Sequence, residues 1–304
     1  MRFLSFGASG LVLGMLVLGA CSSSSTGATT ASSADGGTTP SSSGGSTTDT
    51  GSTAIVRKTT ESVTVNGTAR VYILKVPTKL DPAKTYPLVM DLHGSPGDAA
   101  GQSNDGFETT TGQDAIIVYP QAITEDSGAW SWDLANLAAK NPDVAMLEAL
   151  PAELKTTKGL KIDTTKVFGF GYSGGGFFLQ VYQCLGAKAF RAIAASAGGS
   201  PDSLRSTLGP QDPDACVACP GAPVPELIVF GKLDDTHGGD SQALCQAQLS
   251  GCAATLTNTT PTPCQKYDGC PADKPVEYCN VPDLGHGNWS EAIPTSWAFF
   301  KPYL

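Results

Sequence analysis

The sequence Val-Phe-Gly-Phe-Gly-Tyr-Ser-Gly-Gly-Gly, at residues 167–176, decides the fold of this chain. An apolar run typical of a buried strand leads directly into Gly-Tyr-Ser-Gly-Gly, and the apolar residues 177–185 that follow are typical of a buried helix. Ser173, on a sharp turn between strand and helix, is a candidate nucleophile, because flanking glycines let the chain reverse direction. The same turn directs the backbone N–H of Gly174 toward the place where an oxyanion would form.

Other apolar runs alternate with segments of helical spacing. The predicted strands are residues 87–92, 115–119, 166–170, 191–195, 227–230 and 276–279. Residues 143–155 and 291–300 are predicted helices, the first of them kinked or ended by Pro151. Before them, residues 63–65 and 70–76 predict a hairpin around Asn-Gly. This alternation predicts an α/β fold: a mostly parallel sheet with helices on both faces.

A serine hydroxyl needs a neighbouring base before it can act as a nucleophile, and the chain has 3 histidines. In an α/β-hydrolase the order along the chain is serine, acid, histidine. His93 precedes Ser173 and fails this order. His237 follows the candidate acid too closely to come from the loop of a later strand. His286 follows the predicted last strand in a glycine-containing loop, so it is the candidate base.

The acid should lie between Ser173 and His286, at the carboxyl end of a strand, where sites form in such sheets. Asp234 follows the predicted strand 227–230 and a short turn, so it is the candidate that would orient the imidazole. Three other aspartates stay open as alternatives: the adjacent Asp235, Asp202 and Asp283.

A second oxyanion donor should come from the loop after an early strand. His-Gly-Ser follows the predicted strand 87–92, so the backbone N–H of Ser95 joins that of Gly174 as the candidate donor pair. We expect the ring of His93 to satisfy loop backbone groups and to have no chemical role.

Three tryptophans are candidate substrate-binding residues: Trp130, Trp132 and Trp289. The first two lie in a predicted loop, where a buried core tryptophan is less expected, and the third follows the candidate base. Together they would line an aromatic or sugar-binding cleft. The alternative is that they cover the edge of the sheet.

The N-terminal residues are expected to be a leader and a tether. Residues 1–20 combine Arg2, an apolar run and small residues, as bacterial signal peptides do. Leu-Gly-Ala-Cys resembles a lipobox, so Cys21 is the candidate lipidation site that would hold the exported protein at a bacterial membrane or cell surface. An ordinary secretory signal is the alternative. Residues 21–53, rich in Ser, Thr and Gly, predict a disordered tether, and residues 54–304 a single catalytic domain.

Eight cysteines remain after Cys21, and all of them follow the candidate nucleophile. They are Cys184, Cys216, Cys219, Cys245, Cys252, Cys264, Cys270 and Cys279. An even number behind an export signal predicts up to four disulfides, whose connectivity stays open. Cys216 and Cys219 form a Cys-x-x-Cys motif with zinc-ligand spacing, but no second pair accompanies it, so no metal site is expected.

Five motifs stand in a recognisable order: Leu-Val-Met-Asp-Leu-His-Gly at 88–94, Asp-Val at 143–144, Gly-Phe-Gly-Tyr-Ser-Gly-Gly-Gly at 169–176, Gly-Lys-Leu-Asp at 231–234 and Gly-His at 285–286. Over residues 60–300 the chain resembles secreted polyhydroxybutyrate depolymerase, feruloyl esterase and acetylxylan esterase-like hydrolases. The resemblance implies an α/β-hydrolase fold and ester hydrolysis without a cofactor. It implies the roles nucleophile, acid, base and oxyanion loop for Ser173, Asp234, His286, and Ser95 with Gly174. The chain departs from many members at Phe230, where they have histidine, and in the order His-Gly-Asn-Trp, where they have His-x-Trp-Pro.

The predicted function is therefore that of a serine esterase that acts through an acyl-enzyme. Its expected substrates are feruloyl or acetyl esters of plant polysaccharides, or a hydroxyalkanoate polyester. A serine peptidase is an alternative, because a Ser-Asp-His triad does not distinguish esters from amides, and a non-catalytic surface binding lipoprotein is another. The net charge of −9 and the lack of a basic cluster disfavour nucleic acid as a partner.

Overall fold

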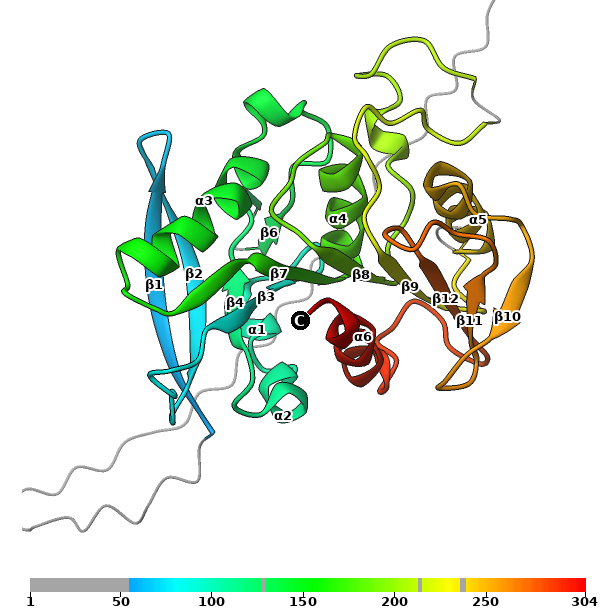
Figure 1. Cartoon of the computed structure of the whole chain (residues 1–304). Coiled ribbons are helices and arrows are strands. Elements are labelled where there is room, and N and C mark those ends of the chain that lie inside the picture. The colour runs from blue at the N-terminus through cyan, green and yellow to red at the C-terminus, as the bar shows by residue number, and fades with distance from the viewer. Residues whose placement is uncertain (1–54, 127–128, 213–214, 236–238) are drawn as a thin grey trace, which may run out of the picture. The chain divides into compact units, whose positions relative to one another are not determined.

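The computed structural model describes residues 55–126, 129–212, 215–235 and 239–304 (Figure 1). The chain divides into Met1–Thr50 and Gly51–Leu304, and all described residues belong to the second unit. The expected signal peptide, Cys21, the whole of the expected tether and His237 lie outside the described residues. Within the described ranges, the helices are all too short or too polar to cross a membrane.

A ten-stranded sheet with the order β1-β2-β4-β3-β7-β8-β9-β12-β11-β10 forms the centre of the fold. Its strands are β1 (Val56–Val65), β2 (Thr68–Pro77), β3 (Tyr86–Leu92), β4 (Ile116–Pro120), β7 (Ile162–Tyr172), β8 (Ala192–Ser196), β9 (Glu226–Gly231), β10 (Leu256–Asn258), β11 (Cys264–Tyr267) and β12 (Val276–Val281). Neighbouring strands are parallel from β4 to β12 and antiparallel beyond, at both edges. The expected mostly parallel sheet is confirmed.

Helices cover both faces of the sheet (Figure 1). The apolar residues of α3 (Pro142–Thr156), α4 (Gly174–Cys184) and α5 (Gly239–Ser250) pack on one face. Those of α1 (Ala99–Gln102), α2 (Phe107–Thr111) and α6 (Ala292–Phe300) pack on the other. The remaining elements are a small hairpin and three short helical turns: β5 (Thr124–Asp126), β6 (Ala129–Ser131), η1 (Ala138–Lys140), η2 (Asp202–Leu204) and η3 (Lys301–Tyr303).

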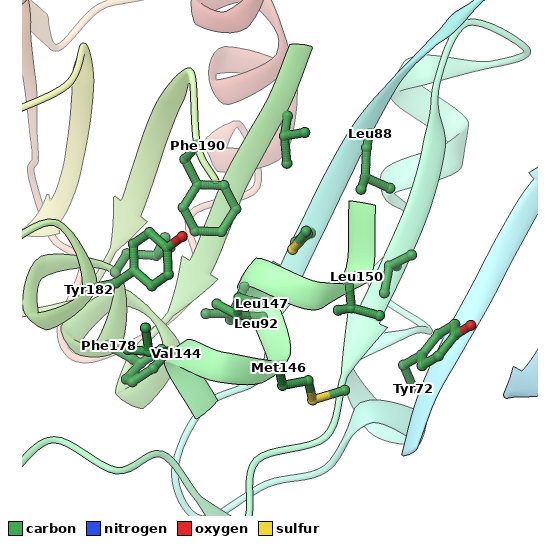
Figure 2. Close-up of a cluster of buried hydrophobic side chains, with 14 of the residues drawn as sticks. Tyr72, Leu88, Leu92, Val144, Met146, Leu147, Leu150, Phe178, Tyr182 and Phe190 are labelled. Carbon is green, nitrogen blue, oxygen red and sulfur yellow. The ribbon is translucent and has the colours of Figure 1, made fainter. Parts of the chain in front are cut away.

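The central strands are continuous apolar runs in the sequence because both of their faces are buried in the core. Every residue of β3 is buried, because helices lie above and below it. In Figure 2, Leu147 and Leu150 of α3 and Phe178 of α4 lie over Leu92 and its neighbours on the sheet. Fully burying a side chain of this kind contributes about 1.5–3 kcal/mol, so this layer stabilises the strands that lead to the candidate nucleophile.

One buried and one partly buried ion pair lie in the part of the chain before Ser173. Arg70 pairs with Asp143 and also donates to the carbonyls of Pro142 (2.6 Å) and Gln121 (3.0 Å). Lys75 Nζ lies 2.6 Å from Glu108 Oε2. Burial raises the pKa of Asp143, and the guanidinium of Arg70 opposes that rise. These pairs connect β2 to α3 and to α2.

Most predicted elements are confirmed, and the differences have physical reasons. The hairpin turns at Asn66 and Gly67, with φ values of 50° and 80°, as a two-residue turn requires. Pro151 does not end its helix, which continues to Thr156. The short hairpin β5–β6, the helix α5 and the edge strands β10 and β11 were not expected, because their sequences carry no clear apolar period.

Candidate active site

Ser173 lies on the turn between β7 and α4. Its backbone has φ 49° and ψ −117°, a region that non-glycine residues rarely adopt. Its N–H donates to the carbonyl of Ser196 on β8 (2.8 Å), and its own carbonyl accepts from Phe177 in the first turn of α4 (2.9 Å). These bonds hold the strained turn in place above the carboxyl end of the sheet.

Glycines make this turn possible. A Cβ atom at Gly171 would lie 2.5 Å from the carbonyl carbon of Gly175, and one at Gly175 would lie 2.7 Å from that of Leu92. Separations below 3.0 Å are sterically forbidden for a real side chain, so the first turn of α4 can pack against β7 and β3 only with glycine at these positions.

The three candidate residues Ser173, His286 and Asp234 form one hydrogen-bonded line. Ser173 Oγ lies 2.9 Å from His286 Nε2, and His286 Nδ1 lies 2.8 Å from Asp234 Oδ2. A ring whose Nδ1–H donates to the carboxylate leaves Nε2 to accept the hydroxyl proton. The side chain of Asp234 is 0% exposed and that of His286 33% exposed. A carboxylate shielded from water thus orients an imidazole that a substrate can reach.

Two loops from parallel strands bring the acid and the base together. Asp234 follows β9 and His286 follows β12, and these two strands pair in parallel register. The N–H of Leu233 donates to the carbonyl of Leu284 (2.8 Å), which ties the loops to each other. A Cβ atom at Gly231 would lie 2.8 Å from the carbonyl carbon of Leu284, so the loops approach backbone to backbone.

The other acids that the sequence left open lie elsewhere. Asp235 is exposed, although it is adjacent to Asp234. Asp202 forms an ion pair with Arg205, and Asp283 is exposed. The structure therefore brings Asp234, and not one of these alternatives, to the imidazole of His286.

His93 is a buried loop residue, as expected. Its Nδ1–H donates to the carbonyl of Gly94 (2.7 Å), and its Nε2 accepts from the N–H of Ala122 (3.2 Å). Burial lowers its pKa, which favours the neutral ring that the two opposite hydrogen-bonding roles of its nitrogens require. These bonds fix the start of the loop that carries Ser95.

The backbones of Ser95 and Gly174 adjoin. A Cβ atom at Gly174 would lie 2.7 Å from the backbone nitrogen of Ser95. The same loop is held on its far side by Gly97 and Trp130, whose backbones exchange hydrogen bonds of 3.1 Å and 3.0 Å. The two N–H groups expected to stabilise an oxyanion therefore lie in neighbouring backbone segments next to Ser173.

The expectation that Trp132 lines a cleft is wrong. Its side chain is 4% exposed, its indole N–H donates to the carbonyl of His93 (2.7 Å), and its ring stacks on Phe178 at 5.0 Å. A polar partner and an aromatic neighbour make this loop tryptophan part of the core. Trp130 and Trp289 are half-buried and pack against the core with part of their rings.

Tyr172 lies beside the candidate base, which the sequence analysis did not anticipate. Its ring centroid is 5.9 Å from that of His286, and a Cβ atom at Gly94 would lie 3.3 Å from its ring. Burial raises the pKa of its hydroxyl group. Its position in the sequence indicates this location, because Tyr172 is the last residue of the strand that ends at Ser173.

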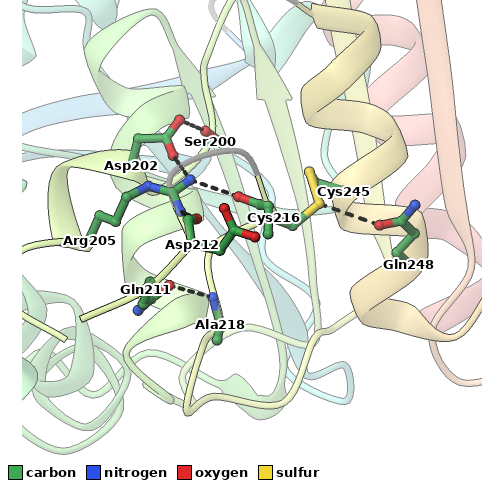
Figure 3. The surroundings of a disulfide bond; sticks show 10 residues. Ser200, Asp202, Arg205, Gln211, Asp212, Cys216, Ala218, Cys245 and Gln248 are labelled. Carbon is green, nitrogen blue, oxygen red and sulfur yellow. Dashed lines mark hydrogen bonds and ion pairs between the residues drawn. A yellow bond between two sulfur atoms is a disulfide. The ribbon is translucent and has the colours of Figure 1, made fainter. Parts of the chain in front are cut away.

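The eight cysteines after Ser173 form four disulfides, as the even count indicated: Cys184–Cys219, Cys216–Cys245, Cys252–Cys270 and Cys264–Cys279. The two residues of the Cys-x-x-Cys motif bond to different partners, so their sulfurs cannot act as a zinc-ligand pair. Figure 3 shows the second of these bonds, between the loop after β8 and α5. Disulfides are typical of proteins from oxidising compartments, which agrees with export.

Comparison with known proteins shows that the chain is similar to esterases. No protein family model matches the chain. Over 253 residues the chain is 28% identical to a probable feruloyl esterase C of Aspergillus oryzae, covering 78% of this chain and 87% of that protein. It is 28% identical to feruloyl esterase C of Emericella nidulans over 249 residues, with 78% and 84% covered. The acetyl xylan esterase from Aspergillus awamori superposes with a TM-score of 0.61 at 18% identity, over 80% of this chain and 99% of that structure. The structural likeness confirms the α/β-hydrolase fold.

Proposed function

We propose that this protein is a serine esterase with Ser173 as nucleophile, His286 as base and Asp234 as acid. One observation carries the proposal: the continuous hydrogen-bonded line from Ser173 Oγ through His286 to the buried carboxylate of Asp234. A serine on a strained turn that donates to an oriented imidazole is the arrangement required for acyl transfer.

Each step of the proposed reaction uses groups of this chain. Ser173 Oγ attacks the ester carbonyl carbon while His286 Nε2 takes its proton. The N–H groups of Ser95 and Gly174 donate to the oxyanion of the tetrahedral intermediate. The intermediate collapses as the protonated His286 gives its proton to the departing alkoxide, which leaves an acyl-serine. A water molecule, deprotonated by His286, then attacks the acyl carbon; the bond to Ser173 Oγ breaks, His286 returns the proton to that oxygen, and the acid is released.

The substrate class is a carboxylic ester, and the relatives suggest which one. Proteins named feruloyl esterase and acetyl xylan esterase are similar to this chain in sequence and in fold, respectively. We propose feruloyl or acetyl esters of plant polysaccharides as substrates, ahead of a hydroxyalkanoate polyester. These steps need no cofactor, because base, acid and oxyanion donors all come from the protein.

The proposed cellular location rests on the sequence. Leu-Gly-Ala-Cys ends an apolar leader and precedes a Ser, Thr and Gly-rich segment, which favours export and a lipid anchor at Cys21. We expect the mature wild-type protein to carry acyl mass, and Cys21→Ser to move from the membrane fraction to the soluble fraction. An intact mass without added acyl groups contradicts the anchor.

A substitution series tests the triad. Ser173→Ala and His286→Ala should each lower kcat on a short aryl ester by about 10⁴–10⁶, and the double variant should lose little more, because the residues act as one unit. A fluorophosphonate probe should label the wild type and not Ser173→Ala. If Ser173→Ala keeps its turnover, the chain is not a serine hydrolase. If the wild type is labelled but cleaves peptides and not esters, it is a peptidase instead.

A further inference from the structure

A second polar cavity lies at the same end of the sheet as the triad. It has a volume of about 170 Å³ and lies between the loop after β8 and the first turn of α5. Its walls include Ser200, Asp202, Gln242 and the disulfide Cys216–Cys245. Nothing in the proposed reaction uses this cavity.

Gln242 brings an unsatisfied amide to the cavity. Its side chain is 3% exposed, and neither its Nε2 nor its Oε1 has a hydrogen-bond partner among the described residues. Burying an amide without partners is costly, and native proteins usually avoid it. Both polar atoms are buried at the cavity wall, so the amide meets a ligand that offers an acceptor and a donor once its side chain turns toward the cavity.

The charges of the cavity already neutralise each other. Arg205 donates to Asp202 at 2.6 Å (Figure 3). It also donates to the carbonyls of Asp212 (2.7 Å) and Ala215 (3.0 Å). Asp202 also accepts from the hydroxyl of Ser200. With both charges committed, the cavity favours a neutral ligand over an ion. Val217 and the disulfide sulfurs give it an apolar wall as well.

The walls of the cavity belong to elements that lie next to the triad. Ser241 lines it and also lines a neighbouring cavity that reaches Asp234. On its other side, Ser200 follows the glycine pair that packs on the first turn of α4, where a Cβ atom at Gly198 would lie 3.1 Å from the Cα of Gly176. Both α4 and the loop of Asp234 carry residues of the candidate site, so the cavity borders the elements that hold the triad.

We propose that the cavity binds a neutral, hydroxyl-bearing ring of the ester substrate and that Gln242 is its specificity-determining residue. The amide supplies the hydrogen bonds to a hydroxyl group, and the apolar wall packs against the ring. A sugar on the alcohol side and a phenol on the acyl side share this chemistry. The inference rests on the proposed ester hydrolysis and adds a distal recognition site to it.

Paired substrates test the proposal and identify the source of the ring. One pair is methyl 4-hydroxycinnamate and methyl cinnamate, and the other is an acetylated methyl xyloside and cyclohexyl acetate. For one pair, Gln242→Leu should reduce the kcat/KM preference for the hydroxylated member about tenfold. Gln246→Leu is the matched control: this glutamine is equally buried one turn further along α5, but lines a different cavity, so both preferences should survive. If Gln242→Leu leaves both preferences unchanged, the proposal is wrong.

Two measurements without turnover separate this inference from the proposed function. In the Ser173→Ala background, calorimetry should detect binding of methyl 4-hydroxycinnamate or methyl xyloside, and Gln242→Leu should weaken it about tenfold. Gln242→Leu should also keep or raise the Tm of the free protein, because it removes an unpartnered amide. A clear drop in Tm would show that the amide has a partner inside the protein, and would overturn the proposal even if esters are hydrolysed normally.

Discussion

The chain before Ser173 and the chain after it are stabilised by different means. Residues 55–172 contain no cysteine; they rely on long apolar strands and on the ion pairs Arg70–Asp143 and Lys75–Glu108. Residues 174–304 contain all four disulfides, shorter strands and the weakly apolar helix α5. A core with satisfied charges stabilises the first part, and covalent bonds replace part of that core in the second.

The candidate site is divided along the same line. The proposed oxyanion donor Ser95 comes from the cysteine-free part, and Ser173 and Gly174 lie at the junction of the two parts. Asp234 and His286 come from the disulfide-bonded part. The two contributions meet because parallel strands end at one edge of the sheet. Stability and chemistry are therefore linked differently in the two parts, and each can be perturbed separately.

The largest effect is expected on kcat, when Asp234, which the disulfide-bonded part contributes to the site, is replaced. Asp234→Asn should lower kcat by up to about 10⁴, because an amide cannot accept from Nδ1–H when its NH₂ group faces the ring, and the wrong tautomer is then held. Asp235→Asn is the control, since its side chain is exposed and should change kcat less than threefold. Steady-state kinetics on an aryl ester measure kcat for both variants. Equal losses in the two variants would show that the acid is misassigned.

The next effect is a loss of stability in the cysteine-free part. Arg70→Met leaves the carboxylate of Asp143 buried without its partner and should lower the free energy of unfolding by about 3–5 kcal/mol. Lys84→Met removes an ion pair whose side chains are 41% and 69% exposed, and should cost about 1 kcal/mol or less. Urea denaturation measures both. A similar small loss in both variants would mean that the buried pair does not stabilise this part.

A smaller effect is expected from removing one disulfide. Replacing Cys264 and Cys279 by alanine opens a loop with a sequence separation of 15, which should lower the free energy of unfolding by about 3 kcal/mol. Replacing Cys252 and Cys270, separated by 18, should cost about the same. The first pair joins β11 to β12, the strand before His286, so its loss should also reduce kcat more. Unchanged urea midpoints for both variants would contradict the comparison.

The smallest effect, taken per pH unit, is a slope of the free energy of unfolding with pH that originates in the second part. Burial raises the pKa of Glu226 from 4.5 to about 8, although the amides of Gln180 and Gln183 donate to it. Because the folded state binds this proton more tightly, the contribution is present below pH 4.5 and is lost as the pH rises to about 8. The loss is at most about 1.4 kcal/mol per pH unit. Denaturation of Glu226→Gln across this range should lack the slope; the same slope in both proteins would assign it to another group.

The parallel strands can be predicted from sequence because each is a short apolar run between breakers. The order of Ser173, Asp234 and His286 can also be predicted, because strand ends fix where their loops lie. The elements at the edge of the sheet cannot be predicted in this way. All three residues of β10 are exposed, and α5 buries Gln242 and Gln246 beside Ala243 and Ala247. No apolar period marks these elements, because disulfides and backbone pairing hold them.

Side-chain direction is the other limit. Asp234 and Asp235 have the same neighbours in sequence, yet one is buried against His286 and the other faces solvent. Trp132 lies in a loop whose composition suggests exposure, but a single carbonyl of His93 and the ring of Phe178 place it in the core. The order of residues along the chain predicts which strand end a residue follows. It does not predict the direction in which the side chain of that residue points.

The pairing of the cysteines has a consequence for how the protein can be made. The bonds Cys184–Cys219 and Cys216–Cys245 interlock along the chain, as do Cys252–Cys270 and Cys264–Cys279. During synthesis, Cys216 emerges when Cys184 is its nearest available partner and Cys245 does not yet exist, so the first bond that an oxidant can form is non-native. Where Cys184–Cys216 forms first, correct pairing requires thiol–disulfide exchange after the later cysteines arrive. A production host should therefore supply a disulfide isomerase together with the oxidant.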